Sequence, residues 1–413
     1  MLIDIGKRAK AASYALADLS TNAKNEILLK IKENLDNFRD EIKNANKKDM
    51  DSGRESGLTD ALLDRLFIDD SRIDSMKDSI DVVLDLKDPI GNISEMNKLP
   101  NGLLIGKKSV PMGVIGIIYE ARPNVTLDTS ILCLKSSNAL ILRGGKEAIN
   151  TNIAIAGIIR KSIEDLGHNP DFVQLIEDIS RDSSIALMKL NGYLDLLIPR
   201  GSANLIRSVV ENSTVPVLET GSGNCHVYVE KSADIDMALD IVKNAKAQRT
   251  GVCNAMESLL VDKGISDEFY KGLQKIVDEF NIKVHSQKEA LEFIKGSVEA
   301  TEEDYYAEYL DFEFSLKIVD DVDEAIENIR QYSTGHSEVI VTENYEAAMK
   351  FMERVDSACV YVNASSRFTD GFEFGMGAEM GISTQKLHAR GPIGLEQLTS
   401  TKFVIMGNGQ IRK

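Results

Sequence analysis

The spacing of apolar residues in the first part of the chain predicts helices. Between residues 4 and 50, apolar side chains recur at steps of three and four, with charged residues between them. This is the pattern of amphipathic helices. Ser20 is suitably placed to cap the second of two such helices. Residues 58–86 repeat the helical spacing. We interpret both regions as packing helices, because neither carries a recognisable chemical motif.

The next segment predicts a β-hairpin. Asn101-Gly102 lies between short apolar runs, and this dipeptide favours the tight turn of a hairpin. A hairpin between a helical and an α/β region indicates a projecting arm, for which we expect β-pairing with another subunit. Residues 402–406 predict a final strand at a sheet edge.

From Gly113 onward the pattern alternates between buried strands and helices. The predicted strands are 114–119, 139–143, 172–176, 194–198, 215–219 and 226–230, and the predicted helices are 125–135, 150–166, 183–190 and 202–211. Such alternation predicts an α/β fold with a largely parallel sheet covered by helices. Ligands of these sheets bind at the carboxyl ends of the strands.

A second α/β set follows the predicted helix 234–246. Its strands are predicted at 259–261, 316–319, 339–342 and 359–362, and its helices at 266–280, 322–332 and 346–355. The turn that holds Cys253 comes just before this set. We therefore expect Cys253 to lie near a domain boundary, where enzyme pockets are common.

Composition narrows the class of protein. The chain has 413 residues, which exceeds one ordinary core, so two or more domains are expected. Its formal charge of −17 disfavours nucleic acid as a partner. Four cysteines without a CxxC pair fit a reducing cytoplasm. We find no signal peptide and no apolar run long enough to span a membrane.

Cys253 is the candidate nucleophile. It follows Gly251-Val252 in a turn among small and polar residues, where a thiol is exposed near backbone N–H groups. A thiol that only fills space is the alternative. Cys133 and Cys359 lie in apolar segments and are predicted to be core residues. Cys225 stands beside His226 like a catalytic pair, but its position at the start of a strand favours ordinary packing.

Two strand ends offer sites for a nucleotide. Gly375–Gly381 has the wrong spacing for a dinucleotide motif and no strand before it. Arg143-Gly144-Gly145-Lys146 instead joins a predicted strand to a helix, and Arg200-Gly201-Ser202 repeats this arrangement. Cations and open backbone at a helix start suit a phosphate group. A solvated turn is the alternative for each.

Two further motifs allow more than one interpretation. Asn124 precedes a predicted helix, where it is either a helix cap or an amide donor to an oxyanion. Lys386, His388 and Arg390 form a cationic cluster that suits an anion site or an ion-paired interface. A metal site is not expected, because the five histidines lack the spacing of metal ligands.

Several of these motifs, in this order, resemble the aldehyde dehydrogenase superfamily and, within it, the γ-glutamyl phosphate reductase family. The resemblance covers nearly the whole chain. Its most specific markers are residues 111–116 (PMGVIG), 120–125 (EARPNV), 251–257 (GVCNAME) and 383–391 (STQKLHARG).

The resemblance implies an aldehyde dehydrogenase-like fold in three parts. These are a Rossmann-like NADP-binding domain (1–95 and 111–248), an α/β catalytic domain (249–387) and a β-hairpin oligomerisation element (96–110 and 388–413). It also implies NADPH-dependent reduction of L-glutamyl 5-phosphate to L-glutamate 5-semialdehyde with release of phosphate, a step of proline biosynthesis. A cytoplasmic homo-oligomer is expected, with the upstream glutamate kinase as a candidate partner.

The resemblance also assigns roles to residues. Cys253 matches the nucleophile, Asn124 the oxyanion donor, Arg143 a contact of the adenosine ribose, and Gly201-Ser202 the pyrophosphate turn. Lys146 stands where NAD-using relatives carry a glutamate, which favours NADP. Glu308 matches a contact of the nicotinamide ribose. Arg122 and Arg367 are candidates for the substrate carboxylate, and Lys386, His388 and Arg390 for the phosphate.

Three alternatives remain open at this point. Glu219 matches the general base of hydrolytic aldehyde dehydrogenases, so a hydrolytic NAD(P)-dependent enzyme is one, although a structural carboxylate fits equally well. A thiol acyltransferase or hydrolase built on Cys253 and a histidine is another. The third is a binding protein without catalysis, which would not need Cys253 on a turn.

Overall fold

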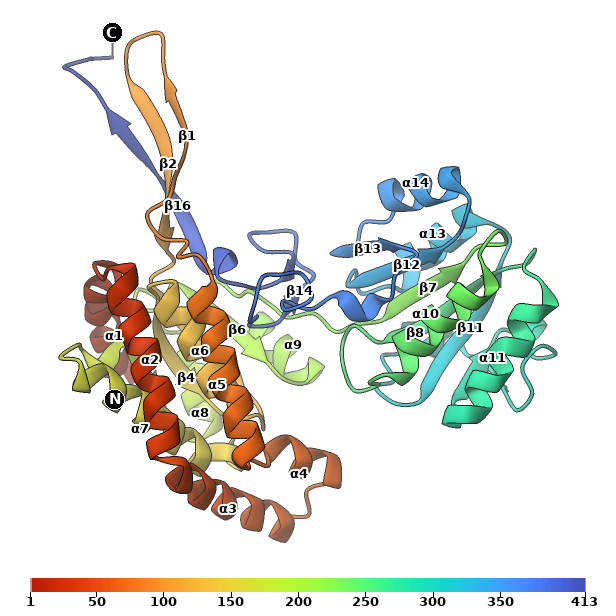
Figure 1. Ribbon diagram of the computed structural model, residues 1–413, viewed down its shortest axis with the longest axis horizontal. Helices are drawn as coiled ribbons and strands as arrows, with labels where there is room; N and C mark the ends of the chain where they lie inside the picture. Colours follow the sequence, from red (N-terminus) through yellow and green to blue (C-terminus); the bar gives the residue numbers. More distant parts are fainter. Residues whose placement is uncertain (1, 413) are drawn as a thin grey trace. The chain divides into compact units, whose positions relative to one another are not determined.

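The computed structural model describes residues 2–412 and divides into two compact units (Figure 1). The first unit comprises Met1–Thr220, Gly375–Gly381 and Ile393–Lys413, and the second comprises Gly221–Phe374 and Ile382–Pro392. The resemblance places the end of the cofactor domain at residue 248, whereas residues 221–248 pack with the second unit.

Five helices open the first unit, in the two regions where the apolar spacing predicts helices; the stretch 4–50, predicted as two helices, contributes to three. They are α1 (Leu2–Ala17), α2 (Thr21–Asn37), α3 (Arg39–Glu55), α4 (Asp60–Leu66) and α5 (Asp70–Asp85). Ser20 caps α2, since its side chain accepts a hydrogen bond from the Ala23 N–H. The apolar stripe of α2, including Ile27, Ile31 and Leu35, is fully buried. These helices are therefore stabilised mainly by packing of their apolar faces against the core.

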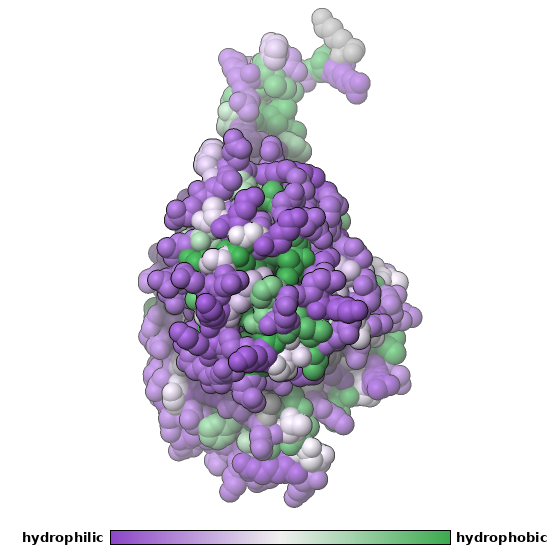
Figure 2. Space-filling model, turned by 90° about the vertical axis from the view of Figure 1, so that its right-hand side faces the viewer, coloured by the Kyte–Doolittle hydropathy of each residue, from purple (hydrophilic) through white to green (hydrophobic). Residues whose placement is uncertain are grey.

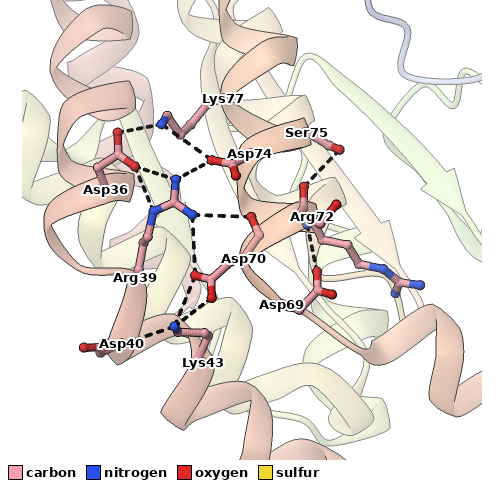
Figure 3. Close-up of polar contacts among 11 residues, drawn as sticks. Asp36, Arg39, Asp40, Lys43, Asp69, Asp70, Arg72, Asp74, Ser75 and Lys77 are labelled. Carbon is pink, nitrogen blue, oxygen red and sulfur yellow. Dashed lines mark hydrogen bonds and ion pairs between the residues drawn. The ribbon is translucent and has the colours of Figure 1, made fainter.

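The outer surfaces of α2, α3 and α5 are joined by ion pairs (Figure 3). Arg39, at the start of α3, pairs with Asp36 at 2.6 Å, with Asp70 at 3.5 Å and with Asp74. Lys77 of α5 pairs with Asp36 at 2.6 Å. Every cation in this group is matched by an aspartate, so we interpret the group as a staple between helices.

A four-stranded parallel sheet forms the centre of the first unit. Its order is β5-β4-β3-β6. The strands are β3 (Val114–Tyr119), β4 (Ala139–Arg143), β5 (Val173–Leu175) and β6 (Leu196–Arg200). The helices between and after them are α6 (Asn124–Lys135), α7 (Ile149–Asp165), α8 (Arg181–Met188) and α9 (Ala203–Asn212). Helices α1, α8 and α9 share one apolar cluster with this sheet. The predicted parallel α/β arrangement is confirmed.

One predicted strand of this region is wrong. The apolar residues at 215–219 suggest a strand, but only Val217 forms an isolated bridge, with Leu197 of β6. Leu218 donates a further backbone hydrogen bond to the Leu197 carbonyl at 2.9 Å. The segment thus follows the sheet edge without a continuous ladder.

The predicted hairpin extends into a three-stranded arm of the first unit (Figure 1). Strands β1 (Ile93–Lys98) and β2 (Leu104–Pro111) pair antiparallel, and β16 (Thr399–Met406) pairs antiparallel with β2. Gly102 has a φ of 88° in the turn, a left-handed conformation that favours glycine. Hydrophobic side chains are exposed on this arm (Figure 2).

A seven-stranded parallel sheet forms the centre of the second unit, in the order β10-β9-β11-β8-β7-β12-β13. The strands are β7 (Cys225–Val229), β8 (Met256–Asp262), β9 (Lys283–Ser286), β10 (Val298–Glu299), β11 (Glu313–Val319), β12 (Ser337–Val341) and β13 (Cys359–Val362). The helices are α10 (Ile235–Ala247), α11 (Asp267–Phe280), α12 (Glu302–Tyr306), α13 (Val322–Tyr332) and α14 (Tyr345–Arg354). Strands β9 and β10 and helix α12 have no counterpart in the sequence prediction.

The second sheet is covered by helices on both faces. Val227 and Val229 of β7 pack with α10 and α11, whereas Tyr228 between them packs with α13 and α14. Successive side chains of a strand point to opposite faces, so continuous apolar strands are required here. No helix between residues 2 and 412 is long and apolar enough to cross a membrane.

Candidate active site

Cys253 lies in a tight turn between α10 and β8, in the second unit. It is partly exposed, whereas Cys133, Cys225 and Cys359 are buried. The turn is held by backbone hydrogen bonds from Val252 to Thr250 and from Ala255 to Val252, at 2.9 and 3.1 Å. The predicted contrast between one accessible thiol and three enclosed ones is therefore present in the structure.

Asn254, the residue after Cys253, anchors this turn to a neighbouring loop. The Asn254 side chain donates to the Thr369 carbonyl at 2.9 Å, and the backbone carbonyl of Asn254 accepts from the Ser366 hydroxyl at 2.7 Å. Ser366 and Thr369 follow β13, through the short 3₁₀ helix η4 (Ser366–Phe368). The Cys253 turn is thus held in place by the loop that contains Ser366 and Thr369, more than 100 residues later in the chain.

Gly223 packs directly against the backbone of Cys253. A Cβ at this glycine would lie 1.4 Å from the Cys253 carbonyl oxygen, so no larger residue fits. The Gly223 N–H donates to Glu308 Oε1 at 2.8 Å. Burial raises the pKa of Glu308, and the Gly223 N–H opposes that shift. The predicted cofactor residue Glu308 therefore lies within one contact of the Cys253 backbone.

Arg367 interacts electrostatically with the Cys253 thiol. Burial lowers the pKa of Arg367, the Arg249 charge lowers it further, and Cys253 raises it. Arg367 Nε donates to Gln248 Oε1 at 2.9 Å. A guanidinium group in electrostatic reach of a thiol favours its thiolate form. Of the two residues predicted for the substrate carboxylate, Arg367 lies in this unit, whereas Arg122 is exposed in the first unit.

The predicted phosphate cations lie between the short strands β14 (Ile382–Ser383) and β15 (Gly391–Pro392). Lys386 and Arg390 both pair with Asp356, Arg390 at 2.7 Å. Hydrogen bonds from Lys386 and Arg390 lower the pKa of Asp356 to about 2. His388 has a φ of 70°. Asp356 was not predicted from the sequence, because nothing local marks it as the shared partner of residues 30 and 34 positions away.

Arg143 is the last residue of β4, as predicted, but its guanidinium is engaged with the protein backbone. It donates to the carbonyl oxygens of Gly144, Ile179 and Ser180 at 3.0, 2.7 and 2.9 Å. Gly144 and Gly145 are buried beside it, whereas Lys146 is exposed. The cation that this turn presents to solvent is therefore Lys146.

A carboxylate lies on the Gly201-Ser202 turn. Glu120, which follows β3, accepts hydrogen bonds from the Ser202 N–H at 2.7 Å and from the Ser202 hydroxyl at 2.9 Å. A Cβ at Gly201 would be 2.6 Å from Glu120 Oε2. The donors of Ser202 are therefore occupied by a carboxylate of the protein itself. Glu120 was not predicted from the sequence, because its contact with Ser202 depends on β3 and β6 being neighbours in the sheet.

Asn124 is the first residue of α6, and its side chain does not cap the helix. Its Nδ2 donates to Asp128 Oδ2 at 2.9 Å. Burial raises the pKa of Asp128 to about 6, and the hydrogen bond from Asn124 and the charge of Arg200 oppose that shift. The helix-cap alternative is therefore wrong. Asp128 was not predicted from the sequence, although a spacing of four residues on one helix places its side chain beside that of Asn124.

The remaining candidates have separate surroundings. Glu219 is partly buried in the first unit. Cys225 and His226 do not pair with each other, because His226 Nδ1 lies 3.1 Å from Glu338 and Cys225 lies near Cys253. Among the residues that the structure describes, no group of three or more His, Cys, Asp or Glu side chains is placed to hold a metal ion.

Comparison with known proteins gives consistent matches. A family model described as the aldehyde dehydrogenase family matches residues 3–293. Gamma-glutamyl phosphate reductase of Clostridium novyi (strain NT) is 54% identical over 411 residues, which cover 100% of this chain and 99% of that protein. The enzyme of Heliobacterium modesticaldum is 53% identical over 407 residues, 98% of each chain. The crystal structure of gamma-glutamyl phosphate reductase from Thermotoga maritima, 47% identical, covers 100% of both chains with a TM-score of 0.98.

Proposed function

This chain belongs to the aldehyde dehydrogenase family, and we propose that it reduces glutamyl 5-phosphate with NADPH through a thioester on Cys253. The reduction to glutamate 5-semialdehyde, a step of proline biosynthesis, follows from relatives that match along the full length of the chain. The single observation that carries the cysteine step is the partly exposed Cys253 thiol in a turn within electrostatic reach of Arg367.

Cys253 attacks the acyl phosphate carbon as the thiolate. The new C–S bond gives a tetrahedral oxyanion, and cleavage of the C–O bond to phosphate leaves a thioester. When bound, NADPH supplies the hydride that reduces this thioester. The resulting hemithioacetal oxyanion re-forms its C=O bond as the C–S bond breaks, which releases the aldehyde and returns the thiolate to Cys253.

Two donors are proposed for the oxyanion: the backbone N–H of Cys253 and the Nδ2 of Asn124. An amide donor must be held in a fixed direction before charge develops. The Asp128 carboxylate does this for Asn124 through their 2.9 Å hydrogen bond. Glu219 is not needed in this scheme, because phosphate release requires no activated water.

The residues of the first unit fit a phosphate-bearing cofactor. The Ser202 N–H and hydroxyl already bind a carboxylate, and Gly201 leaves room for it. The Gly144-Gly145 turn would hold the adenosine ribose, with Arg143 maintaining the shape of the loop. The exposed Lys146 would pair with the 2′-phosphate, which supports NADP over NAD. Glu308 remains the proposed contact of the nicotinamide ribose.

The departing phosphate and the rest of the substrate need cations. Lys386, His388 and Arg390 are proposed for the phosphate, and Arg367 and Arg122 for the glutamyl carboxylate. Asp356 reduces the net charge available from Lys386 and Arg390. Phosphate binding there should therefore be weak enough for the product to leave.

We further propose a cytoplasmic homo-oligomer that forms through the arm. Phe403, Ile405 and Met406 of β16 are 65%, 59% and 54% exposed, and exposed apolar groups on an edge strand mark a pairing surface. Phe403→Asp should shift the enzyme to a smaller species in size-exclusion chromatography with light scattering. Glutamate kinase remains the candidate partner for channelling of the labile acyl phosphate.

The decisive experiment measures the reverse reaction. Oxidation of glutamate semialdehyde with NADP should require inorganic phosphate, because the thioester has no other acceptor. Cys253→Ala should abolish the reaction while NADPH still binds in a fluorescence titration, and Cys133→Ala is the matched control. Oxidation without phosphate would instead indicate a hydrolytic dehydrogenase that uses Glu219, and failure to bind NADPH would favour the thiol acyltransferase.

A further inference from the structure

Cys225 contacts the proposed nucleophile through the protein backbone. It is the first residue of β7, and its side chain is fully buried. Its Sγ lies 3.1 Å from the Cys253 carbonyl oxygen and 3.6 Å from His336 Nδ1. Burial is the main cause that raises the pKa of the Cys225 thiol well above its ordinary value, and the negative charge of Glu338 raises it further. The group is therefore a neutral thiol that can donate a hydrogen bond.

A chain of buried polar groups continues behind Cys225. His336 Nδ1 lies 2.8 Å from the Ser337 hydroxyl, which lies 2.7 Å from the Thr369 hydroxyl. The Thr369 hydroxyl lies 2.7 Å from the Tyr361 hydroxyl. These groups come from the start of β12, from β13 and from the loop after η4. Three separate segments of the second unit thus form the polar chain behind this thiol.

The same row of polar groups also contacts the Cys253 turn through Asn254. The Thr369 carbonyl accepts from the Asn254 side chain at 2.9 Å, and Asn254 is the residue after Cys253. The peptide that joins these two residues is therefore held at its carbonyl oxygen by Cys225 and at its next side chain by Thr369. Gly223 closes off a further side of the same oxygen.

We propose that Cys225 is a positioning residue for the reaction of Cys253, an inference that rests on the proposed function. Its S–H donates to the Cys253 carbonyl oxygen and so fixes the ψ angle of Cys253. This angle sets the direction in which the Cα–Cβ bond of Cys253 leaves the turn, and so where its side chain starts. The groups from His336 to Tyr361 hold Cys225 in place from behind.

A buried thiol has simpler uses, but the surroundings argue against them. A cysteine that only fills space needs no polar neighbours, yet Cys225 has polar contacts on two sides. Catalysis as an acid or base with His336 would need a histidine that titrates near neutral pH, and burial lowers the pKa of His336 to about 4. A Cys225 thiol that stays neutral and donates one fixed hydrogen bond agrees with its polar contacts and with the lowered pKa of His336.

The test compares Cys225→Ala with Cys225→Ser. Alanine removes the donor, whereas serine keeps an O–H in nearly the same position. The rate of Cys253 alkylation by iodoacetamide, with the labelled peptide identified by mass spectrometry, and kcat should both fall about tenfold in Cys225→Ala, as expected for loss of one hydrogen bond. Cys225→Ser should retain most of both rates. The dissociation constant of NADPH should not change in either variant.

Two controls separate this role from a loss of stability and from failure of the proposed function. Cys133→Ala removes a buried thiol from the first unit and should leave alkylation and kcat unchanged. If Cys225→Ala does not fold, Tyr361→Phe removes the far end of the chain and should slow alkylation about threefold. Unchanged alkylation in Cys225→Ala, or equal losses with serine and alanine, would overturn the proposal. Persistent reduction by Cys253→Ala would instead refute the nucleophile itself.

Discussion

The Glu120 carboxylate accepts two hydrogen bonds from Ser202, one from the backbone N–H at 2.7 Å and one from the hydroxyl at 2.9 Å. These donors lie at the start of α9, where the resemblance places the cofactor pyrophosphate. A carboxylate on this turn competes with a phosphate for the same two donors and repels its charge.

Glu120→Gln should therefore bind NADPH more tightly than the unmodified enzyme. The substitution keeps the size of the side chain and removes its charge. The dissociation constant should fall about tenfold, the margin of a charge-assisted hydrogen bond over a neutral one. Fluorescence titration at constant ionic strength measures this. Glu211→Gln, at the other end of α9, is the control for net charge. Weaker binding in Glu120→Gln would mean that Glu120 itself contacts the cofactor.

Asp128 predicts a pH dependence of turnover. Its pKa is raised to about 6 by burial, so the carboxylate that orients Asn124 is charged above pH 6 and neutral below it. We expect kcat to decline as the pH falls through 6. Asp128→Asn should lack this inflection and show a lower kcat at pH 8. A kcat profile from pH 5 to 8 checks both, and an unchanged inflection in Asp128→Asn would assign it to another group.

Asp356 should limit the affinity for phosphate. Asp356→Asn releases Lys386 and Arg390, so inhibition by phosphate should become about two- to fivefold stronger, as expected for loss of one exposed ion pair. Asp323→Asn is a matched control, because Asp323 pairs with Lys350 and Arg354 at 2.5 Å each on α14. Equal inhibition constants in the two variants would show that Lys386 and Arg390 do not bind the phosphate.

His336 should make stability depend on pH. Burial lowers its pKa from 6.5 to about 4, so the unfolded chain takes up a proton before the folded one. Its contribution is fully present above pH 6.5 and is lost as the pH falls through 4, by ~3 kcal/mol in total. Calorimetric melting between pH 4.5 and 7 should show a smaller slope in His336→Gln. An unchanged slope in His336→Gln would assign the pH dependence to other groups.

The ion-pair staple of Figure 3 should contribute modestly to stability. Arg39 pairs with three aspartates on two helices, and its side chain is 23% exposed. Arg39→Met should lower the free energy of unfolding by about 1 kcal/mol, and less at high salt. Arg54→Met removes a single exposed pair with Asp51 and should cost less. Equal losses for Arg39→Met and Arg54→Met would show that the three aspartates do not act as a staple.

The sequence by itself determined the periodic elements and the identity of the thiol. Local spacing predicts helices α2 and α5 and strand β4, because each of these needs only an apolar face. The Asn101-Gly102 turn is predicted because it needs only one permitted backbone conformation. Cys253 was identifiable because its neighbours are small and polar. The motifs around it also indicated the family to which the chain belongs.

The partners of these residues were decided only by the tertiary structure. Ser202 is 82 residues from Glu120, and His336 is 111 residues from Cys225. Such contacts depend on which strands become neighbours, here β3 with β6 and β7 with β12, and no local pattern encodes that choice. For the same reason the sequence did not show that the Arg143 guanidinium binds carbonyl oxygens of a distant loop. It also did not show that the apolar residues 215–219, which lie beside β6, form only one bridge with it. Residue type is a local property, whereas the hydrogen-bond partner of a residue is a property of the packed fold.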